Sequence, residues 1–268
     1  MTELDIVSIG IWSPFFSNWK EFSDGINTGN WQSEALLQPG LIPPRERRRA
    51  PQSVKMAVEV LDQACSTASL DPAAAAVVFS SAMGDMQITD YMCRILSATP
   101  RLVSPIRFHN SVHNATTGYW SITSQTHAPT NAVSAYDYTA PMAFFEAACQ
   151  ASEDNMPVLL VTQEMAAPPA LHSICPSEQP FSSALLITKR GYCDNTVASI
   201  GFSVKPKAVE WPDLPGDLKQ SFEGNFGARL LPLIALIATD NFTQSTQGFD
   251  LEFPLSPGSC LCISVSAR

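Results

Sequence analysis

The stretch NAVSAYDYTAPMAFFEAACQASEDNMPVLLVT, which runs from Asn131 to Thr162, decides the fold class. It predicts a short strand at 131–136, an alanine-rich helix at Ala140–Ala151 and an apolar strand at Pro157–Thr162. A strand, a helix and an almost continuously apolar strand in this order are typical of an α/β protein whose sheet is covered on both faces. We therefore expect an α/β fold.

The same alternation extends to both sides of this stretch. After Pro51, apolar residues recur at the spacing of an amphipathic helix. Pro232 is expected to kink a helix around Ala228–Thr239 or to delay its start. The other predicted elements are strands at Leu4–Gly10, Ala75–Ser80, Ser183–Lys189, Val197–Val204, Gly248–Phe253 and Cys260–Val265, and helices at Asp85–Leu96 and Val112–Gln125.

The composition excludes several classes of protein. Of the 268 residues, 45% are hydrophobic and 15% are charged, whereas globular chains carry about 25% charged residues. We therefore expect a large buried core or a surface that a partner covers. The net charge of −9 argues against a nucleic-acid partner. The apolar run at Leu230–Ala238 is too short to span a membrane.

The N-terminus and the cysteines indicate the compartment. The acidic start Met1–Asp5 lacks the basic residues of a signal peptide. The seven cysteines are odd in number and scattered, so we expect free thiols in a cytoplasmic protein.

Motifs for metal binding and common catalysis are weak. His109 and His113 have the spacing of zinc ligands on one helix face, but no third ligand follows them. Cys260 and Cys262 would share one face of a strand, and without a second pair nearby we expect them to pack in the core. We therefore expect no metal site. The chain contains neither Gly-x-Ser-x-Gly nor a phosphate-binding glycine loop.

A basic cluster is unusual in this acidic chain. It consists of Arg45, Arg47, Arg48 and Arg49. Two interpretations remain open at this point, a solvated or internally ion-paired segment and a docking patch for an acidic protein or a phosphate.

The segment FHNSVHNATTGYWSI, Phe108–Ile122, resembles the segment that precedes the nucleophile in β-ketoacyl synthases of the thiolase superfamily. As in that family, a polar loop, a short strand at Asn131–Ala135 and an alanine-rich helix follow it. Ile9–Pro14, Arg47–Arg49 with the helix behind them, and Ala75–Gly84 resemble earlier elements, so the resemblance covers about residues 4–190.

This resemblance implies a thiolase-like layered α-β-α-β-α fold. It implies a single ketosynthase-like domain, residues 1–268, with an N-terminal thiolase-like half at 1–165 and a reduced C-terminal half at 166–268.

The resemblance also places Tyr136 where the family carries its nucleophilic cysteine. A phenol is a poor nucleophile toward thioesters at neutral pH, and Asp137 adds negative charge where an incoming malonyl group would be disfavoured. The family's two catalytic histidines lie in its C-terminal half, where this chain has His172 alone, without a matching motif. We therefore expect that the chain does not condense acyl groups by itself.

Chain-length factors are ketosynthase-like subunits that lack the nucleophile, pair with an active ketosynthase and shape the acyl tunnel. The resemblance is to the short subunit of this kind in bacterial aryl polyene biosynthesis, a type II system with free acyl carrier proteins. It implies no cofactor. It implies a partner interface at Asn131, Ala132, Val133, Ser134 and Ala135, a tunnel at Tyr136, Asp137, Tyr138, His109, His113 and Phe144, and carrier or partner docking at Arg45, Arg47, Arg48 and Arg49.

Three alternatives stay open. Each aromatic residue of the expected tunnel could equally be packed in the core. The chain could be an acyl-thioester enzyme of another mechanism, using Ser111, His113 or Cys149. It could also be a homodimeric module that binds a carrier protein through its arginine cluster.

Overall fold

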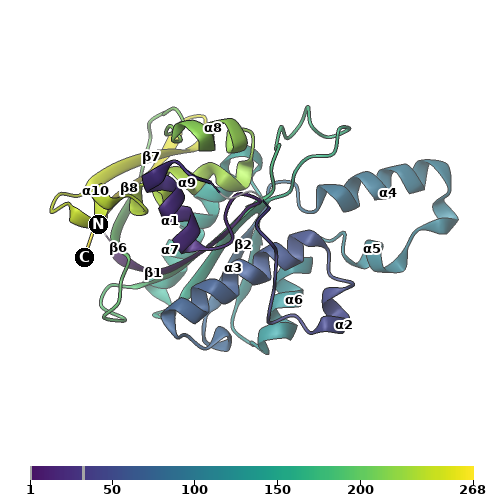
Figure 1. Ribbon diagram of the computed structural model, residues 1–268, viewed down its shortest axis with the longest axis horizontal. Coiled ribbons are helices and arrows are strands. Elements are labelled where there is room, and N and C mark those ends of the chain that lie inside the picture. The colour runs from purple at the N-terminus through teal and green to yellow at the C-terminus, as the bar shows by residue number, and fades with distance from the viewer. Residues whose placement is uncertain (1, 32–33) are drawn as a thin grey trace.

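The computed structural model describes residues 2–31 and 34–268. In these residues the strands form one eight-stranded sheet in the order β3-β2-β4-β5-β1-β6-β8-β7 (Figure 1). The strands are β1 (Thr2–Trp12), β2 (Ala76–Ser80), β3 (Thr130–Val133), β4 (Val158–Glu164), β5 (Phe181–Lys189), β6 (Ala198–Lys205), β7 (Phe249–Ser256) and β8 (Ser259–Ser266).

Parallel and antiparallel pairing divide this sheet. β2 runs parallel to β3 and to β4, whereas the other neighbours are antiparallel. Parallel strands need a crossover connection, usually a helix, and β3 is joined to β4 by the long helix α7 (Thr139–Glu153). Every residue of β2 and β4 is buried, which explains their continuous apolar sequences.

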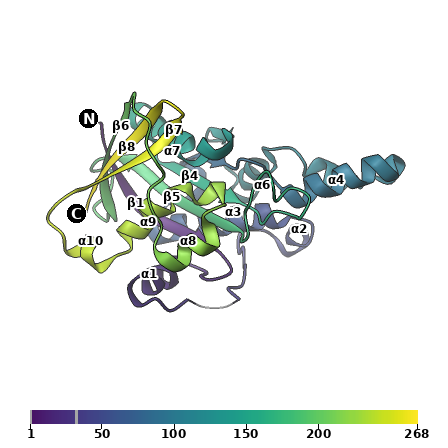
Figure 2. The ribbon, with the colours of Figure 1, turned by 90° about the horizontal axis from the view of Figure 1, so that it is seen from above.

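Helices cover both faces of the sheet (Figure 2). On one face α3 (Gln52–Ala68) and Trp120 of α6 pack against alternate residues of β2 and β4, such as Phe79 and Val161. On the other face α7 and α9 pack against the intervening residues. In this numbering α6 is Ala115–Ser124 and α9 is Leu231–Ile237. The other helices are α1 (Trp19–Thr28), α2 (Pro44–Arg47), α4 (Met86–Ala98), α5 (Pro105–His109), α8 (Gly216–Phe222) and α10 (Asp240–Gln244).

The α/β class is confirmed, and so is the almost continuous apolar character of the central strands. Residues 166–268 contribute β5 to β8 to a sheet shared with the N-terminal strands. The reason is that β1 pairs with β5 along one edge and with β6 along the other, which joins the two sets of strands.

Three local expectations have clear outcomes. The delayed start at Pro232 is confirmed, because a 3-10 turn, η4 (Phe226–Leu230), precedes α9 and Pro232 lies in the first turn of α9. The expectation of one helix face for His109 and His113 is wrong, because α5 ends at His109 and α6 begins at Ala115. The strand expected at 131–136 ends at Val133, because the chain then turns into the 3-10 turn η3 (Tyr136–Tyr138).

The helices that the structure describes also bear on membrane insertion. None of them combines the length and the apolar composition that a membrane crossing requires.

Strand β1 and helix α3 approach each other without side chains between them at Gly10. A Cβ atom at Gly10 would lie 1.9 Å from the carbonyl oxygen of Val60. Ser8 strengthens the same contact by donating a 2.7 Å hydrogen bond to the carbonyl oxygen of Ala64.

Gly10→Ala should therefore lower the free energy of unfolding by about 3 kcal/mol, because backbone atoms must move apart. Gly118→Ala is the matched control, since Gly118 lies in α6 with nothing within 4 Å of an added Cβ. This control should raise the free energy of unfolding by about 0.5–1 kcal/mol. Chemical denaturation measures both changes, and equal effects of the two substitutions would contradict the close approach.

Candidate functional site

The candidate site lies at the carboxyl ends of the parallel strands β2, β3 and β4. In open α/β sheets, ligands bind in the crevice outside these strand ends. Two of the loops that follow the strands touch here, because Ser134 Oγ, after β3, donates a 3.0 Å hydrogen bond to the carbonyl oxygen of Ala82, after β2.

Tyr136 occupies the sharp turn between β3 and α7. Its φ of 52° is in the left-handed region, which costs a residue with a side chain about 1–2 kcal/mol. Thr139 stabilises the turn: its Oγ1 accepts a 2.8 Å hydrogen bond from the N–H of Ala135 and donates a 2.6 Å bond to the carbonyl of Tyr136. A strained residue at a strand-to-helix turn is the geometry that presents a nucleophile in some α/β enzymes. Here it presents a phenol.

Segments from residues 166–268 hold the Tyr136 side chain. Its hydroxyl donates a 2.8 Å hydrogen bond to the carbonyl of Ile174, and its ring packs edge-on against Phe226 at 4.9 Å between centroids. Phe226 begins η4, which packs so closely on β4 that a Cβ atom at Gly227 would lie 2.3 Å from the carbonyl carbon of Gln163. The ring nevertheless stays 52% exposed.

Asp137 and Tyr138 are held in the same way. The Asp137 carboxylate lies 2.7 Å from the guanidinium of Arg229, which also stacks over Trp211 at 4.5 Å. The Tyr138 ring lies nearly parallel to Trp211 at 6.3 Å. Sequence reasoning missed Arg229 and Trp211, because more than seventy positions separate them from their partners and no local spacing marks the contact.

Glu164, the last residue of β4, fixes the loop after β2. Its buried carboxylate accepts hydrogen bonds from Ser81 Oγ at 2.9 Å and from the N–H groups of Ala82 at 2.8 Å and Met83 at 3.3 Å. Burial outweighs these bonds and raises the pKa of Glu164 to about 7. No sequence motif marks Glu164, since it is a lone acidic residue at a strand end.

The thiols near this site are poor nucleophiles. Cys175 follows Ile174 and is fully buried, and burial together with the charge of Glu164 raises the pKa of its thiol to about 12. The pKa of Cys149 in α7 is also raised, by burial and by the neighbouring Glu146 and Glu153. A thiolate is the reactive form of cysteine, so neither thiol is activated. This weighs against acyl transfer through Cys149.

The other expected polar residues have separate partners. His113 Nε2 lies 2.7 Å from the carbonyl oxygen of Ser81, which makes His113 a structural tether of that loop. Ser111 Oγ donates to the carbonyl of Phe108 rather than to His113. His109 is exposed at the end of α5, and His172 pairs with Glu178 at the surface.

The residues expected to line the tunnel and the interface lie in different environments. Phe144 of α7 is fully buried in the core, which fits the alternative that this aromatic residue packs in the core and does not line a tunnel. Strand β3 is the edge of the sheet, and Asn131 and Ala132 are exposed on it. Ser134 and Ala135 lie beyond the end of β3. Tyr136 is exposed at the site, and Asp137 and Tyr138 beside it are half-buried.

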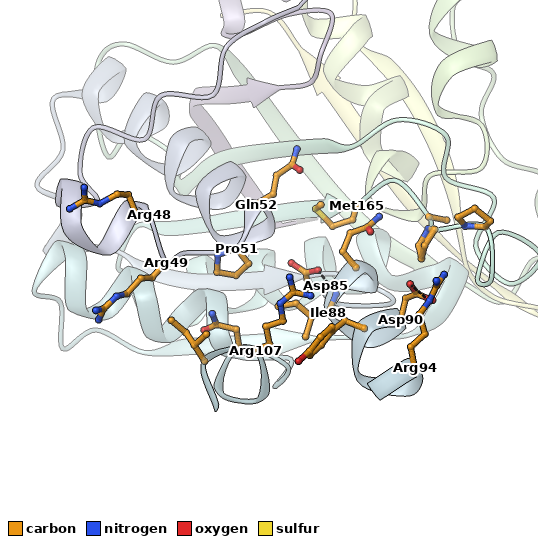
Figure 3. Close-up of a pocket in the computed structure, with 17 residues that line it drawn as sticks. Arg48, Arg49, Pro51, Gln52, Asp85, Ile88, Asp90, Arg94, Arg107 and Met165 are labelled. Carbon is orange, nitrogen blue, oxygen red and sulfur yellow. Dashed lines mark hydrogen bonds and ion pairs between the residues drawn. The ribbon is translucent and has the colours of Figure 1, made fainter. Parts of the chain in front are cut away.

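A large cavity of about 970 Å³ lies beside α4 and α5 (Figure 3). Asn110, which lines it, is 5% exposed and its Oδ1 has no hydrogen-bond partner among the described residues. Arginines surround the cavity: Arg48 and Arg49 in the turn between α2 and α3, and Arg94 and Arg107 on α4 and α5.

The arginine cluster seen in the sequence divides in two. Arg47 turns inward and donates to the carbonyl of Ile42 at 2.9 Å. Arg48 and Arg49 line the cavity, and Arg45 stays exposed on α2. In the described part of the chain, none of these four residues forms a salt bridge, so internal ion pairing does not explain the cluster.

Residues 86–112, which we call the arm, project away from the sheet (Figures 1 and 2). In α4, Met86 and Ile88 are the residues that are buried. The arm exposes large apolar side chains, with Leu102 69% and Phe108 62% exposed. Such patches mark interaction surfaces when they are contiguous. The exposed apolar residues of the arm are Leu96, Leu102, Ile106, Phe108 and Val112.

The mixed sheet with helices on both faces, and with its candidate site at a strained strand-to-helix turn, defines a ketosynthase-like fold of the thiolase type. The family description "Beta-ketoacyl synthase, N-terminal domain" matches residues 18–212. The chain belongs to this β-ketoacyl synthase family. A comparison with curated protein sequences found no match.

Solved structures show the same fold at low sequence identity. The complex of the ketosynthase ApeO with its chain length factor ApeC from Xenorhabdus doucetiae matches with a TM-score of 0.68 and 20% identity, over 98% of this chain and 99% of that chain. The AntDE:AntF complex consists of a type II polyketide synthase acyl carrier protein and its ketosynthase. It matches with a TM-score of 0.77 and 13% identity, over 100% of this chain and 99% of that chain. A β-ketoacyl synthase from Burkholderia phymatum STM815 matches with a TM-score of 0.61 and 14% identity, over 84% of this chain and 69% of that chain.

The raised pKa of Glu164 predicts a pH dependence of stability. Since the pKa is about 7 in the folded chain and 4.5 in the reference state, the folded state binds the proton more tightly. The stability that Glu164 contributes is therefore fully present below about pH 4.5 and is lost as the pH rises through 7, a loss of about 3 kcal/mol.

Glu164→Gln should remove this dependence, because the amide is neutral at every pH. Denaturation curves between pH 5 and pH 8, compared between wild type and variant, measure it. The exposed Glu153→Gln is the matched control and should leave the dependence in place. An unchanged pH dependence in Glu164→Gln would show that the carboxyl does not carry the proton.

Proposed function

We propose that this chain is a non-catalytic chain-length factor. It pairs with an active β-ketoacyl-acyl-carrier-protein synthase and shapes the tunnel for the acyl chain, in a type II polyene or fatty-acid-like pathway. The observation that carries the proposal is Tyr136 at the strained turn after β3, where its ring and hydroxyl are held by Phe226 and Ile174. A residue fixed in this way shapes a surface and offers no thiolate.

The exposed apolar arm and the open edge of β3 support a protein partner. Permanent interfaces are large and more apolar than ordinary surface. The large apolar residues of the arm are exposed, and β3 is an edge strand of the sheet formed by the described residues, so its outer backbone groups can pair with a strand of another subunit. An interface at Asn131–Ala135 fits this edge. The likeness to the complex of the ketosynthase ApeO with its chain length factor ApeC supports a ketosynthase as the partner. The aryl polyene pathway as the setting rests on the resemblance seen in the sequence.

The arginine-lined cavity supports docking of an acyl carrier protein. Carrier proteins bring an anionic phosphopantetheine arm, and Arg48 and Arg49 line the cavity without a salt bridge to any described residue, in an otherwise acidic chain. One of the similar structures contains an acyl carrier protein with its ketosynthase. Within the original cluster, Arg48 and Arg49 are better placed for this role than Arg47, which is turned toward backbone carbonyls.

We further propose that residues 1–268 form one domain and that the protein works in the cytoplasm. The shared sheet supports a single domain, because β1 pairs with strands of the C-terminal part on both edges. Seven free cysteines support a reducing compartment.

Co-expression with the ketosynthase of the same pathway should give a stable one-to-one complex. Leu102→Asp on the arm should weaken this complex at least about 10-fold, because a charge must be desolvated in the interface. Leu36→Asp is the matched control, since Leu36 is 71% exposed outside the arm. Size-exclusion chromatography with light scattering and titration of purified subunits measure both. A folded monomer that binds none of the candidate ketosynthases would refute the proposal.

Tyr136→Ala and Tyr138→Ala should lengthen or broaden the acyl products of the complex, because smaller side chains leave more room in the tunnel. Tyr192→Ala provides the control, since Tyr192 is 52% exposed, like Tyr136, and lies in the turn after β5. Mass spectrometry of carrier-bound products measures the chain lengths. Unchanged products in both variants would argue against a tunnel role for these tyrosines.

A further inference from the structure

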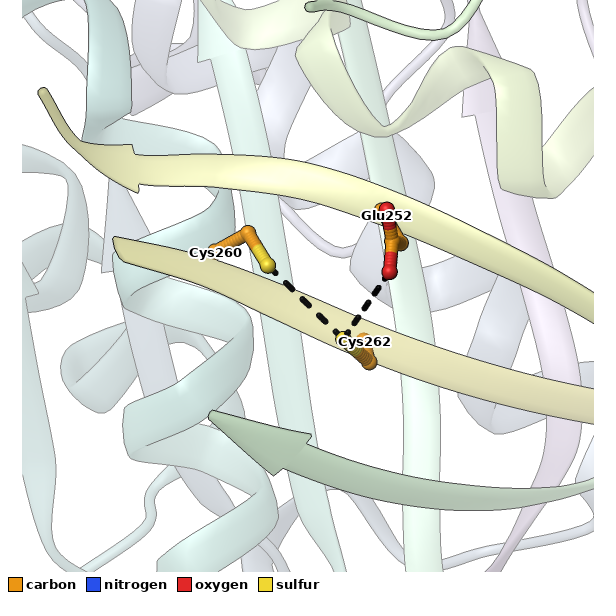
Figure 4. Close-up of side chains that lie close together, drawn as sticks. All are labelled: Glu252, Cys260 and Cys262. Carbon is orange, nitrogen blue, oxygen red and sulfur yellow. Dashed lines mark hydrogen bonds between the residues drawn. The ribbon is translucent and has the colours of Figure 1, made fainter. Parts of the chain in front are cut away.

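Three possible metal ligands meet on strands β7 and β8, far from the site described above in sequence (Figure 4). Cys260 and Cys262 alternate with Leu261 and Ile263, which face the core. The cysteines therefore lie on the face of the sheet opposite to these two residues. Cys260 is fully buried, which fits the expectation that it packs in the core, whereas Cys262 is half-buried. Glu252 of β7 is the cross-strand neighbour of Cys262.

Two of the distances between the ligand atoms match those of a tetrahedral zinc site. The two Sγ atoms are 3.8 Å apart, and Cys262 Sγ lies 3.7 Å from Glu252 Oε1. Zinc bonds of ~2.3 Å to sulfur and ~2.1 Å to oxygen at tetrahedral angles place two sulfurs ~3.8 Å apart and a sulfur and an oxygen ~3.6 Å apart. All three ligand atoms lie within 4.8 Å of one another.

We propose that Glu252, Cys260 and Cys262 bind a zinc ion. Two sulfurs with a carboxylate favour zinc over magnesium or calcium, which take oxygen ligands. Binding breaks two S–H bonds, forms two Zn–S bonds and one Zn–O bond, and releases two protons to the solvent. The proposal departs from the expectation of no metal site and does not depend on the proposed function.

The charges around the cluster tolerate a dication. Glu252 uses its Oε2 atom for a 2.7 Å ion pair with Lys207, which leaves Oε1 facing Cys262. Lys205 lies 3.8 Å from Oε1. Because zinc replaces two thiol protons, the net charge of the cluster is the same before and after binding. The electrostatic interaction between the two lysines and the cluster is therefore about the same with the zinc ion bound as with the two thiols protonated.

The backbone holds the three ligands in place before any ion arrives. β8 is paired on both sides, with β6 and with β7, so the ligand positions are fixed by two ladders of hydrogen bonds. Cys260 is fully buried, whereas Cys262 and Glu252 line a cavity of about 470 Å³. A fourth zinc position would open toward this cavity, where a water molecule completes the tetrahedron.

The test is zinc binding by the purified, reduced chain. After incubation with zinc and dialysis, elemental analysis should find one zinc per chain. Cobalt in place of zinc should give the thiolate charge-transfer and tetrahedral d–d absorption bands. Cys262→Ser and Glu252→Gln should weaken binding at least about 100-fold and about 10-fold respectively.

Cys93→Ser is the matched control, because Cys93 is an exposed thiol on the arm. It should bind zinc like the wild type. Circular dichroism of each variant shows that the fold is retained, and Cys260→Ser gives a second ligand variant should Cys262→Ser fail to fold. Absence of bound zinc in the wild type, or equal zinc binding by the wild type and both cysteine variants, would overturn the proposal.

Discussion

The pairing of β1 on both of its edges is the constraint on which the rest of the structure depends. The first strand of the chain lies inside the sheet, between β5 and β6, so the sheet is complete only when residues 181–205 have joined it. Helix α3 then lies directly on β1 at Gly10. The cost of closing these long loops is met by burying β1, β2 and β4 on both faces.

Because the two parts of the chain share this sheet, the candidate site is built by both. The turn at Tyr136 comes from the N-terminal part, whereas the groups that hold its three side chains, such as Arg229 and Phe226, come from the C-terminal part. The C-terminal part of the chain therefore fixes the positions of the side chains at the site. The nearby thiol of Cys175 is buried, and its raised pKa keeps it protonated. This arrangement suits a subunit that shapes a tunnel better than one that attacks a thioester.

Particular residues show how far prediction from sequence reached. The helix after Pro51 and the delayed helix at Pro232 were predictable, because apolar spacing and the proline ring act within a few residues. His109 and His113 were not, since the five-residue helix α5 ends without a sequence signal that distinguishes it from a longer one. Glu164 was missed because its partners, Ser81 to Met83, lie about eighty positions away.

The sequence by itself determined the α/β class and the two cysteines on one face of a strand, because both follow from local periodicity, while the place of Tyr136 at the turn after β3 was implied by the family resemblance. The tertiary structure decided that Glu252 faces Cys262, that Arg229 pairs with Asp137 and that the arm stands free with its apolar side chains exposed. The physical reason is that strand register and long-range packing come from the balance of buried surface over the whole chain. No short segment contains that balance.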